Sequence, residues 1–165
     1  MGRRNKLLYV AGAYRADSPW GVRNNVMAAA AVSRTLWIHG YTAHCPHLNN
    51  WDLDGPELPS DAILQGDFEI IRRCDGIVVC PGWGNSSGTR QEIVLGLRLG
   101  KPVLFFPRDP AEVSIFLTNL DEVMYERSGT EAEVGPTDDP TPPVTGGPAG
   151  VDPTSLSSWS RPDVV

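Results

Sequence analysis

Two carboxylates, Asp67 and Glu92, have surroundings in the sequence that could support chemistry. Glu92 stands in the first turn of a predicted helix over residues 89–99, where the positive end of the helix dipole would keep it ionised. Asp67 lies near the middle of the preceding predicted helix, over residues 60–73. If both side chains reach one cleft, they can carry out displacement at an anomeric carbon: one attacks the carbon and the other positions the substrate or moves a proton.

Each carboxylate also has a purely structural interpretation. The run Thr89-Arg90-Gln91-Glu92 has the form of a capping box, in which the Glu92 carboxylate would bond to free N–H groups at the start of its own helix. A charged residue such as Asp67 in an amphipathic helix commonly lies on the solvated face. The two interpretations differ in whether the carboxylates converge, and the residues alone leave both open.

A turn rich in glycine and serine, Pro81-Gly82-Trp83-Gly84-Asn85-Ser86-Ser87-Gly88, precedes Thr89. It follows a predicted strand and precedes a helix, but its Gly82-x-Gly84-x-x-x-Gly88 spacing is one residue too long for the dinucleotide-binding fingerprint. Free N–H groups at a helix N-terminus still attract an anion. The turn therefore predicts a site for a small phosphate or carboxylate.

A second polar cluster contains His44, Cys45 and His47 within four residues. No further Cys/His pair stands at the spacing of a structural zinc site, so we expect no metal. His47, beside Asn49 and Asn50, is interpreted as a polar wall of the pocket or as a solvated loop histidine.

Strands and helices are predicted to alternate along the chain. Buried strands are expected at residues 7–11, 41–45, 75–80 and 102–106, with a fifth at 123–125; helices are expected at 19–39, 60–73 (with Ser60 as N-cap), 89–99 and 111–119. This alternation predicts an α/β fold, a doubly wound open parallel sheet of about five strands covered on both faces. Because ligands bind beyond the carboxyl ends of such strands, we expect function in loops 12–18, 46–60 and 81–88.

The composition excludes several classes of protein. At 165 residues and 41% hydrophobic content, the chain has room for one globular domain. Its formal charge of −6 has the wrong sign for binding polymeric nucleic acid. The three cysteines suit reduced thiols in a core, and no apolar stretch is long enough for a signal sequence or a membrane span, so we expect a cytoplasmic protein.

The composition changes at Ser128, which sets the expected domain at residues 1–127. Seven of the chain's fifteen prolines lie beyond this point, together with six acidic residues and one basic residue. Such a segment cannot bury a core, so residues 128–165 are predicted to form a disordered acidic tail. A short partner-binding peptide at residues 156–159 is the alternative.

Four segments together resemble the nucleoside 2-deoxyribosyltransferase superfamily over about residues 7–120. They are Tyr9-Val-Ala-Gly-Ala-Tyr-Arg15, Asp67 with Asp75 eight residues later, Pro81-Gly82 with Ser86-Ser-Gly-Thr-x-x-Glu92, and Gly100-Lys-Pro-Val. The arrangement is most similar to the branch that hydrolyses the N-glycosidic bond of nucleoside 5′-monophosphates. Small phage-associated relatives share the segment Cys45-Pro-His-Leu-Asn49.

The resemblance implies a flavodoxin-like sheet and a role for each matching residue. Glu92 matches the catalytic glutamate, which forms a covalent intermediate with the sugar or stabilises its cationic state, and Asp67 matches the second catalytic carboxylate. Gly12, Tyr14 and Arg15 match the loop that wraps the nucleotide. At the position of Ser86, transferases of free nucleosides carry Asp and monophosphate hydrolases carry Ser. A carboxylate there would repel a 5′-phosphate, whereas a hydroxyl can donate a hydrogen bond to it.

These expectations combine into one leading hypothesis, an N-glycosidase acting on a (deoxy)ribonucleoside 5′-monophosphate without a cofactor. The turn formed by Ser86, Ser87, Gly88 and Thr89 would anchor the phosphate, and Trp83 or Tyr14 would stack on the base. A 2-deoxyribosyltransferase that exchanges bases and a non-catalytic nucleotide-binding or sensing module are the alternatives. The resemblance also implies a homo-oligomer, a dimer or larger.

Overall fold

Four short parallel strands form the sheet of the computed structural model, which describes residues 6–53 and 55–129. They are β1 (Leu7–Ala11), β2 (Thr42–His44), β3 (Gly76–Val79) and β4 (Val103–Phe105), in the order β2-β1-β3-β4. The chain first adds β2 on one side of β1 and then β3 on the other side. The winding direction thus reverses at β1, and the carboxyl ends of β1 and β3 flank the crevice where such sheets bind ligands.

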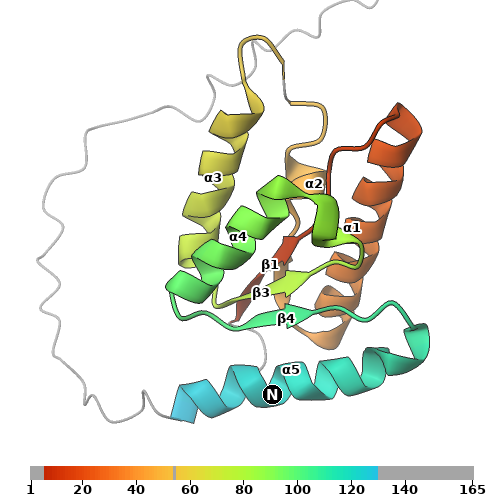
Figure 1. The fold of residues 1–165 in the computed structure, drawn as a ribbon. Helices are drawn as coiled ribbons and strands as arrows, with labels where there is room; N and C mark the ends of the chain where they lie inside the picture. The colour runs from red at the N-terminus through yellow and green to blue at the C-terminus, as the bar shows by residue number, and fades with distance from the viewer. Residues whose placement is uncertain (1–5, 54, 130–165) are drawn as a thin grey trace, which may run out of the picture. The chain divides into compact units, whose positions relative to one another are not determined.

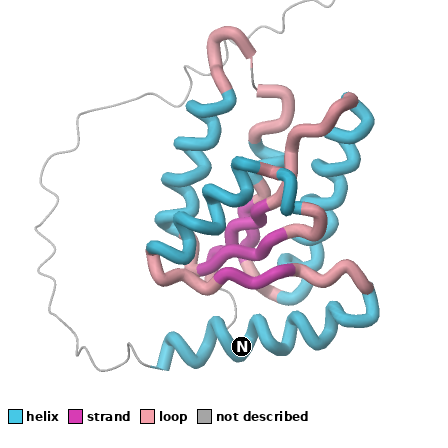
Figure 2. The backbone as a smooth tube through the Cα atoms, in the orientation of Figure 1, coloured by secondary structure: helices cyan, strands magenta, loops and turns pink. Residues whose placement is uncertain are grey.

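Helices cover both faces of this sheet in a flavodoxin-like arrangement (Figures 1 and 2). The α-helices are α1 (Pro19–His39), α2 (Pro46–Asn49), α3 (Ser60–Arg73), α4 (Ser87–Arg98) and α5 (Val113–Gly129), and two 3₁₀ turns are η2 (Trp83–Asn85) and η3 (Pro110–Glu112). Figure 1 shows α3 and α4 together on one side of the sheet, with α1 and α5 on the other. Helices α3 and α4 are therefore the pair that can supply side chains from this face of the sheet to a site at the carboxyl ends of the strands.

Alternating side chains of the strands feed two separate cores, as the pleat of a strand requires. On the α1 and α5 side, Val10 and Val78 pack in one apolar cluster with Leu36 and Leu120. On the α3 and α4 side, a second cluster holds Tyr9 and Ile77 with Ile71 and Ile93. Both faces of β1 and β3 are buried, which explains why these strands read as continuous apolar runs.

The ends of α1 confirm the boundaries predicted from Ser18, Pro19 and Gly40. The Ser18 Oγ accepts a hydrogen bond from the Gly21 N–H at 3.1 Å, and Pro19 is the first helical residue. Gly40 ends the helix with φ at 102°, a left-handed conformation that glycine adopts without a steric penalty.

The predicted fifth strand at residues 123–125 is wrong, because this segment is part of α5. Phe116, Leu120 and Met124 recur every four residues and pack together on the core, so the helical period of the buried side chains outweighs the local strand preference. The prediction that Ser60 caps its helix is also wrong. Pro59 occupies the N-cap position and makes no side-chain cap, while the Ser60 Oγ accepts a hydrogen bond from Arg15.

The predicted tail at residues 128–165, apart from its first two residues, and the alternative peptide at 156–159 lie outside the described residues. Helix α5 continues to Gly129, two residues past the predicted domain end. None of the helices formed by residues 6–53 and 55–129 is long and apolar enough to cross a membrane. Cys45, Cys74 and Cys80 are buried free thiols.

Candidate functional site

A cavity of about 450 Å³ opens beyond the carboxyl ends of β1 and β3. Its walls come from the loop after β1, from α2, from α3 and from the N-terminal turns of α4. Ten of the twelve residues predicted for the site line this cavity: Gly12, Tyr14, Arg15, His47, Asp67, Ser86, Ser87, Gly88, Thr89 and Glu92. All three loops expected to carry function contribute to it.

Glu92 is a buried cavity residue, only 6% exposed, and it does not cap its helix. Helix α4 begins at Ser87, two residues earlier than predicted, with Ser86 as N-cap; the Ser86 Oγ accepts from the Thr89 N–H at 3.2 Å and from the Thr89 hydroxyl at 2.9 Å. The capping-box interpretation of Glu92 is therefore wrong. Its carboxyl group instead accepts a hydrogen bond from the Tyr9 hydroxyl at 2.7 Å.

Burial raises the pKa of Glu92 to about 7. The hydrogen bond from Tyr9 opposes this shift, and the negative charge of Asp67 adds to it. Burial also raises the pKa of Tyr9 well above its ordinary value, with the charge of Glu92 as the next cause. Tyr9 thus remains a neutral hydrogen-bond donor that holds one oxygen of Glu92 in place.

Asp67 lies on the wall of the same cavity, 7% exposed, so its interpretation as part of the solvated face is wrong. The neighbouring Ile63 and Leu64 line the cavity too, which places one face of α3 on the site. Asn50, just after α2, donates from Nδ2 to the Asp67 Oδ1 at 2.9 Å. Burial raises the pKa of Asp67 to about 6, and the hydrogen bond from Asn50 opposes the shift.

The two carboxyl groups form one titrating system near neutral pH. They are carried by α3 and α4, which pack side by side on one face of the sheet (Figure 1), and both groups line one cavity. With pKa values of about 7 for Glu92 and about 6 for Asp67, the pair passes through a state with a single shared proton between these values. One ionised carboxylate and one carboxylic acid are the groups that nucleophilic attack with protonation of a leaving group requires.

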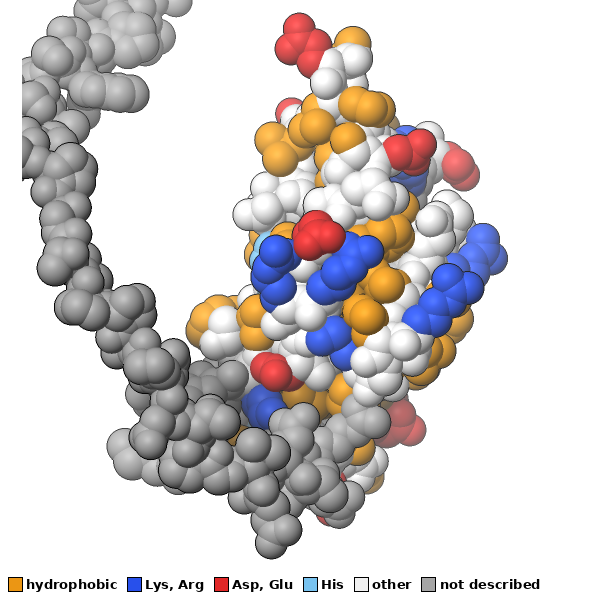
Figure 3. Space-filling model, turned by 90° about the vertical axis from the view of Figure 1, so that its left-hand side faces the viewer, with side chains coloured by type: hydrophobic (Ala, Val, Ile, Leu, Met, Phe, Trp, Pro, Cys, Tyr) orange, Lys and Arg blue, Asp and Glu red, His pale blue; other side chains and the backbone are white. Residues whose placement is uncertain are grey.

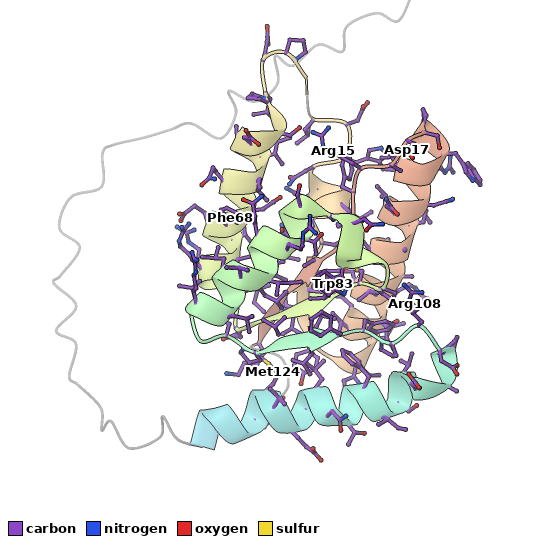
Figure 4. The ribbon with its side chains drawn as sticks, viewed as in Figure 1. Arg15, Asp17, Phe68, Trp83, Arg108 and Met124 are labelled. Atoms are coloured by element: carbon purple, nitrogen blue, oxygen red, sulfur yellow. The ribbon has the colours of Figure 1, made fainter. Side chains whose placement is uncertain are left out.

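The loop after β1 is held in place by three side chains from other segments. His47 is buried and its Nε2 lies 3.0 Å from the Ala13 carbonyl, which can only accept, so Nε2 carries the proton. Burial lowers the pKa of His47, which keeps the ring neutral. The Asn25 Nδ2 donates to the carbonyls of Tyr14 and Arg15 at 3.1 and 3.2 Å. The Arg15 guanidinium, whose position Figure 4 labels, donates to Ser60 across the cavity.

The N-terminus of α4 forms another part of the cavity wall. Asn85, Ser86, Ser87 and Gly88 line it, and the first backbone N–H groups of a helix have no partner within the helix. The positive end of the helix dipole points to the same place. This part of the cavity wall has the chemistry of an anion site, and Glu92 lies about one helical turn further along α4.

Two predicted site residues, Trp83 and Asn49, are not among the residues that line the cavity. Trp83 packs against Phe105 of β4 with ring centroids 5.4 Å apart, and Figure 4 shows it beside β4, away from Arg15. Asn49 is exposed and donates to the Asn50 Oδ1 at 2.8 Å. The turn of α2 directs Asn50 to the cavity in its place.

Sequence reasoning did not assign a site role to Tyr9 or Asn50. Tyr9 lies in a buried strand, where a tyrosine is usually a core residue, and its partner Glu92 is 83 residues away in the sequence. A tyrosine two residues before the end of a strand indicates a site residue only once the packing of α4 against β1 is known. Within the part of the chain that the structure describes, no group of three or more His, Cys, Asp or Glu could hold a metal ion.

Comparisons with known proteins give a family model and similar solved structures. A family model described as "Domain of unknown function (DUF4406)" matches residues 6–105. The chain is similar to the solved structure of a 2-deoxyribosyltransferase from the psychrotolerant bacterium Bacillus psychrosaccharolyticus, with 17% identity, a TM-score of 0.48, and coverage of 65% of this chain and 79% of that chain. No curated protein matches the chain.

Proposed function

The chain belongs to the DUF4406 family, and from the geometry of its cavity we propose that it is an N-glycosidase that cleaves the N-glycosidic bond of a (deoxy)ribonucleoside 5′-monophosphate. One observation carries the proposal. Two carboxyl groups, each more than nine-tenths buried, line a single cavity that is also lined by a helix N-terminus. A volume of about 450 Å³ lies within the range of small-ligand sites.

In the first step, the ionised Glu92 carboxylate attacks C1′ of the sugar. A C–O bond forms between the glutamate and C1′, the C1′–N bond breaks, and its electron pair leaves with the base. The reactive form is the one in which the single proton of the pair is on Asp67, the less populated arrangement because Glu92 has the higher pKa, and Asp67 gives this proton to the departing nitrogen. Tyr9 holds one oxygen of Glu92 by a hydrogen bond, which leaves the other oxygen to attack.

In the second step, water attacks C1′ of the glycosyl–enzyme ester. The bond between C1′ and the Glu92 oxygen breaks and the carboxylate is restored, while the proton lost by the water goes to ionised Asp67. The net reaction consumes one water and yields the free base and the (deoxy)ribose 5-phosphate. Both carboxyl groups end in their starting states, so the chemistry uses no cofactor.

The phosphate of the substrate is assigned to the N-terminus of α4. The hydroxyl of Ser86 accepts two hydrogen bonds within the helix and still has its own hydrogen to donate. Ser87 and Gly88 add backbone N–H groups, and Arg15 is a cation among the lining residues. The Tyr14 ring meets the His47 ring edge to face, with ring centroids 6.1 Å apart. Tyr14 is the aromatic side chain available to stack on the base.

The test is release of free base from a panel of nucleosides and their 5′-monophosphates, followed by chromatography. We expect release from at least one monophosphate and at least 10-fold less from its nucleoside, because the charged hydrogen bonds are lost. Glu92→Gln should lower turnover by about 10³-fold or more, while the exposed Glu112→Gln control keeps it.

Three outcomes would change the assignment. A new nucleoside formed when a second base is added would make the protein a transferase. Tight nucleotide binding with no chemistry, in wild type and Glu92→Gln alike, would make it a binding module. Absence of both binding and base release, in a folded protein, would defeat the proposal.

A further inference from the structure

The Asp67 carboxyl has a fixed neighbour on the cavity wall. Asn50 donates from Nδ2 to the Asp67 Oδ1 at 2.9 Å, and both residues line the cavity. Among the residues that the structure describes, this is the hydrogen bond that the Asp67 carboxyl makes to protein. The partners are seventeen residues apart, one just after α2 and the other within α3, so the contact exists only in the folded chain.

We propose that Asn50 is a positioning residue for Asp67: it orients the carboxyl group and makes Oδ2 the oxygen that carries and delivers the proton. The inference rests on the proposed glycosidase function. A protonated carboxyl has one oxygen that bears hydrogen and one that accepts. Since the Asn50 amide N–H can only donate, it pairs with the oxygen that bears no proton, which is Oδ1.

The orientation of the Asn50 amide is itself determined by its neighbours. Its backbone N–H donates to the Pro46 carbonyl at 2.7 Å, which holds the residue at the end of α2. Its Oδ1 accepts from the Asn49 Nδ2 at 2.8 Å. An amide flip would place the Asn50 nitrogen against the Asn49 amide nitrogen and lose that hydrogen bond, and it would place an oxygen against the ionised Asp67 carboxylate, which cannot donate to it.

Other ionisable groups also face Asp67. Glu92 from α4 and Tyr9 from β1 interact with it electrostatically, and the remaining ionisable residues of the cavity wall are Tyr14, Arg15, His47 and Asp61. Burial favours the protonated form of Asp67, and the N–H of Asn50 favours the ionised form. Asn50 thereby keeps the proton of Asp67 transferable, since a group that gives up its proton in one step must take it back in the next.

A measurement on the free protein tests the contact without any substrate. The Asp67 carboxyl carbon is followed by ¹³C NMR against pH, with Asp67→Asn identifying its signal, in wild type, Asn50→Ala and Asn50→Asp. We expect the pH at the midpoint of the Asp67 titration to rise in Asn50→Ala. It should rise further in Asn50→Asp, which keeps the side-chain size but adds a second carboxyl group. Asn24→Ala, an exposed position on α1, should leave the midpoint unchanged. An unchanged midpoint in both Asn50 variants would overturn the inference.

Steady-state kinetics then separates positioning from substrate contact. In Asn50→Ala we expect kcat to fall by about 10-fold or more with KM little changed, and the high-pH limb of the rate profile to move upward. A higher KM with kcat intact would overturn the positioning role, because Asn50 would then act by touching substrate. If Asn50→Ala does not fold, the same-size Asn50→Asp variant decides the matter.

The two proposals fail differently. Turnover by wild type with an unmoved Asp67 midpoint defeats the role of Asn50 alone. A moved midpoint in a protein that turns over no nucleotide defeats the glycosidase proposal, and with it the delivery of a proton by Asp67.

Discussion

At the scale of single residues, the site is defined by acids held in conditions that favour their neutral forms. Glu92 and Asp67 each lose most of their contact with water, and burial is the largest cause of both raised pKa values. Each carboxyl group accepts one hydrogen bond, Glu92 from the Tyr9 hydroxyl and Asp67 from the Asn50 side-chain amide nitrogen. One oxygen of each carboxyl is thereby engaged and the other is left for substrate.

Glu92 should make the fold less stable as pH rises. Its pKa is about 7 in the folded protein against 4.5 ordinarily, so between these values the unfolded chain loses a proton that the folded chain keeps. Stability therefore falls through this window and stays lower above it. Glu92→Gln removes the effect and should be more stable than wild type at pH 8 by up to about 3 kcal/mol, with little difference at pH 4.5.

Urea unfolding of wild type and Glu92→Gln at the two pH values measures this difference, with the exposed Glu112→Gln as the matched control. If the free energies of unfolding of the two proteins differ by the same amount at both pH values, Glu92 titrates in the folded chain as it does in the unfolded one.

At the scale of elements, the cavity depends on how closely the end of β1 approaches its neighbours. Gly12, the first residue after β1, lies where a Cβ atom would be 3.0 Å from the Cys80 Cβ and 3.4 Å from the His47 ring. Neither neighbour is at the free end of a flexible side chain. The absence of a side chain at Gly12 lets His47 reach the Ala13 carbonyl and hold the loop that carries Tyr14.

Gly12→Ala should therefore destabilise the protein by about 1–3 kcal/mol through overpacking. The matched control is Gly66→Ala in α3, where nothing lies within 4 Å of the added Cβ and alanine should stabilise the helix by up to about 1 kcal/mol. Urea unfolding of the two variants against wild type measures both changes. Equal stability of Gly12→Ala and wild type would mean that the loop after β1 moves freely to make room.

At the scale of the whole molecule, the parallel order β2-β1-β3-β4 brings the elements that form the site together at the carboxyl ends of the strands. Figure 3 views the side that carries α3 and α4, where basic side chains lie beside exposed apolar ones. Val94 and Leu97 of α4 are 43% and 60% exposed. The self-association implied by the family resemblance stays a prediction, which sedimentation of the purified chain would measure.

A chain that ends at Glu133, where the first of two units ends, should fold as the full chain does. Both apolar clusters and the cavity are built from residues no later than Met124, so removal of residues 134–165 takes away none of these contacts. We expect the free energy of unfolding to change by less than about 0.5 kcal/mol. A larger loss in urea unfolding would show that the removed segment packs against the domain.

The elements and the location of the site were predictable from the sequence, because their signals are local. Ser18, Pro19 and Gly40 mark the ends of α1 by their own backbone and side-chain chemistry. Short apolar runs predicted the four parallel strands, and the rule for strand ends then located the cavity loops. Most of the cavity-lining residues followed from these loops and from the family resemblance.

Tertiary structure alone decided which side chains meet. The Tyr9–Glu92 and Asn50–Asp67 pairs, the turning of Trp83 toward Phe105, and the helical state of residues 123–125 all depend on contacts between elements distant in sequence. A helix period or a capping motif records only what each segment does by itself. Burial that raises two pKa values in one cavity arises when α3 and α4 pack over β1, and no local pattern encodes that packing.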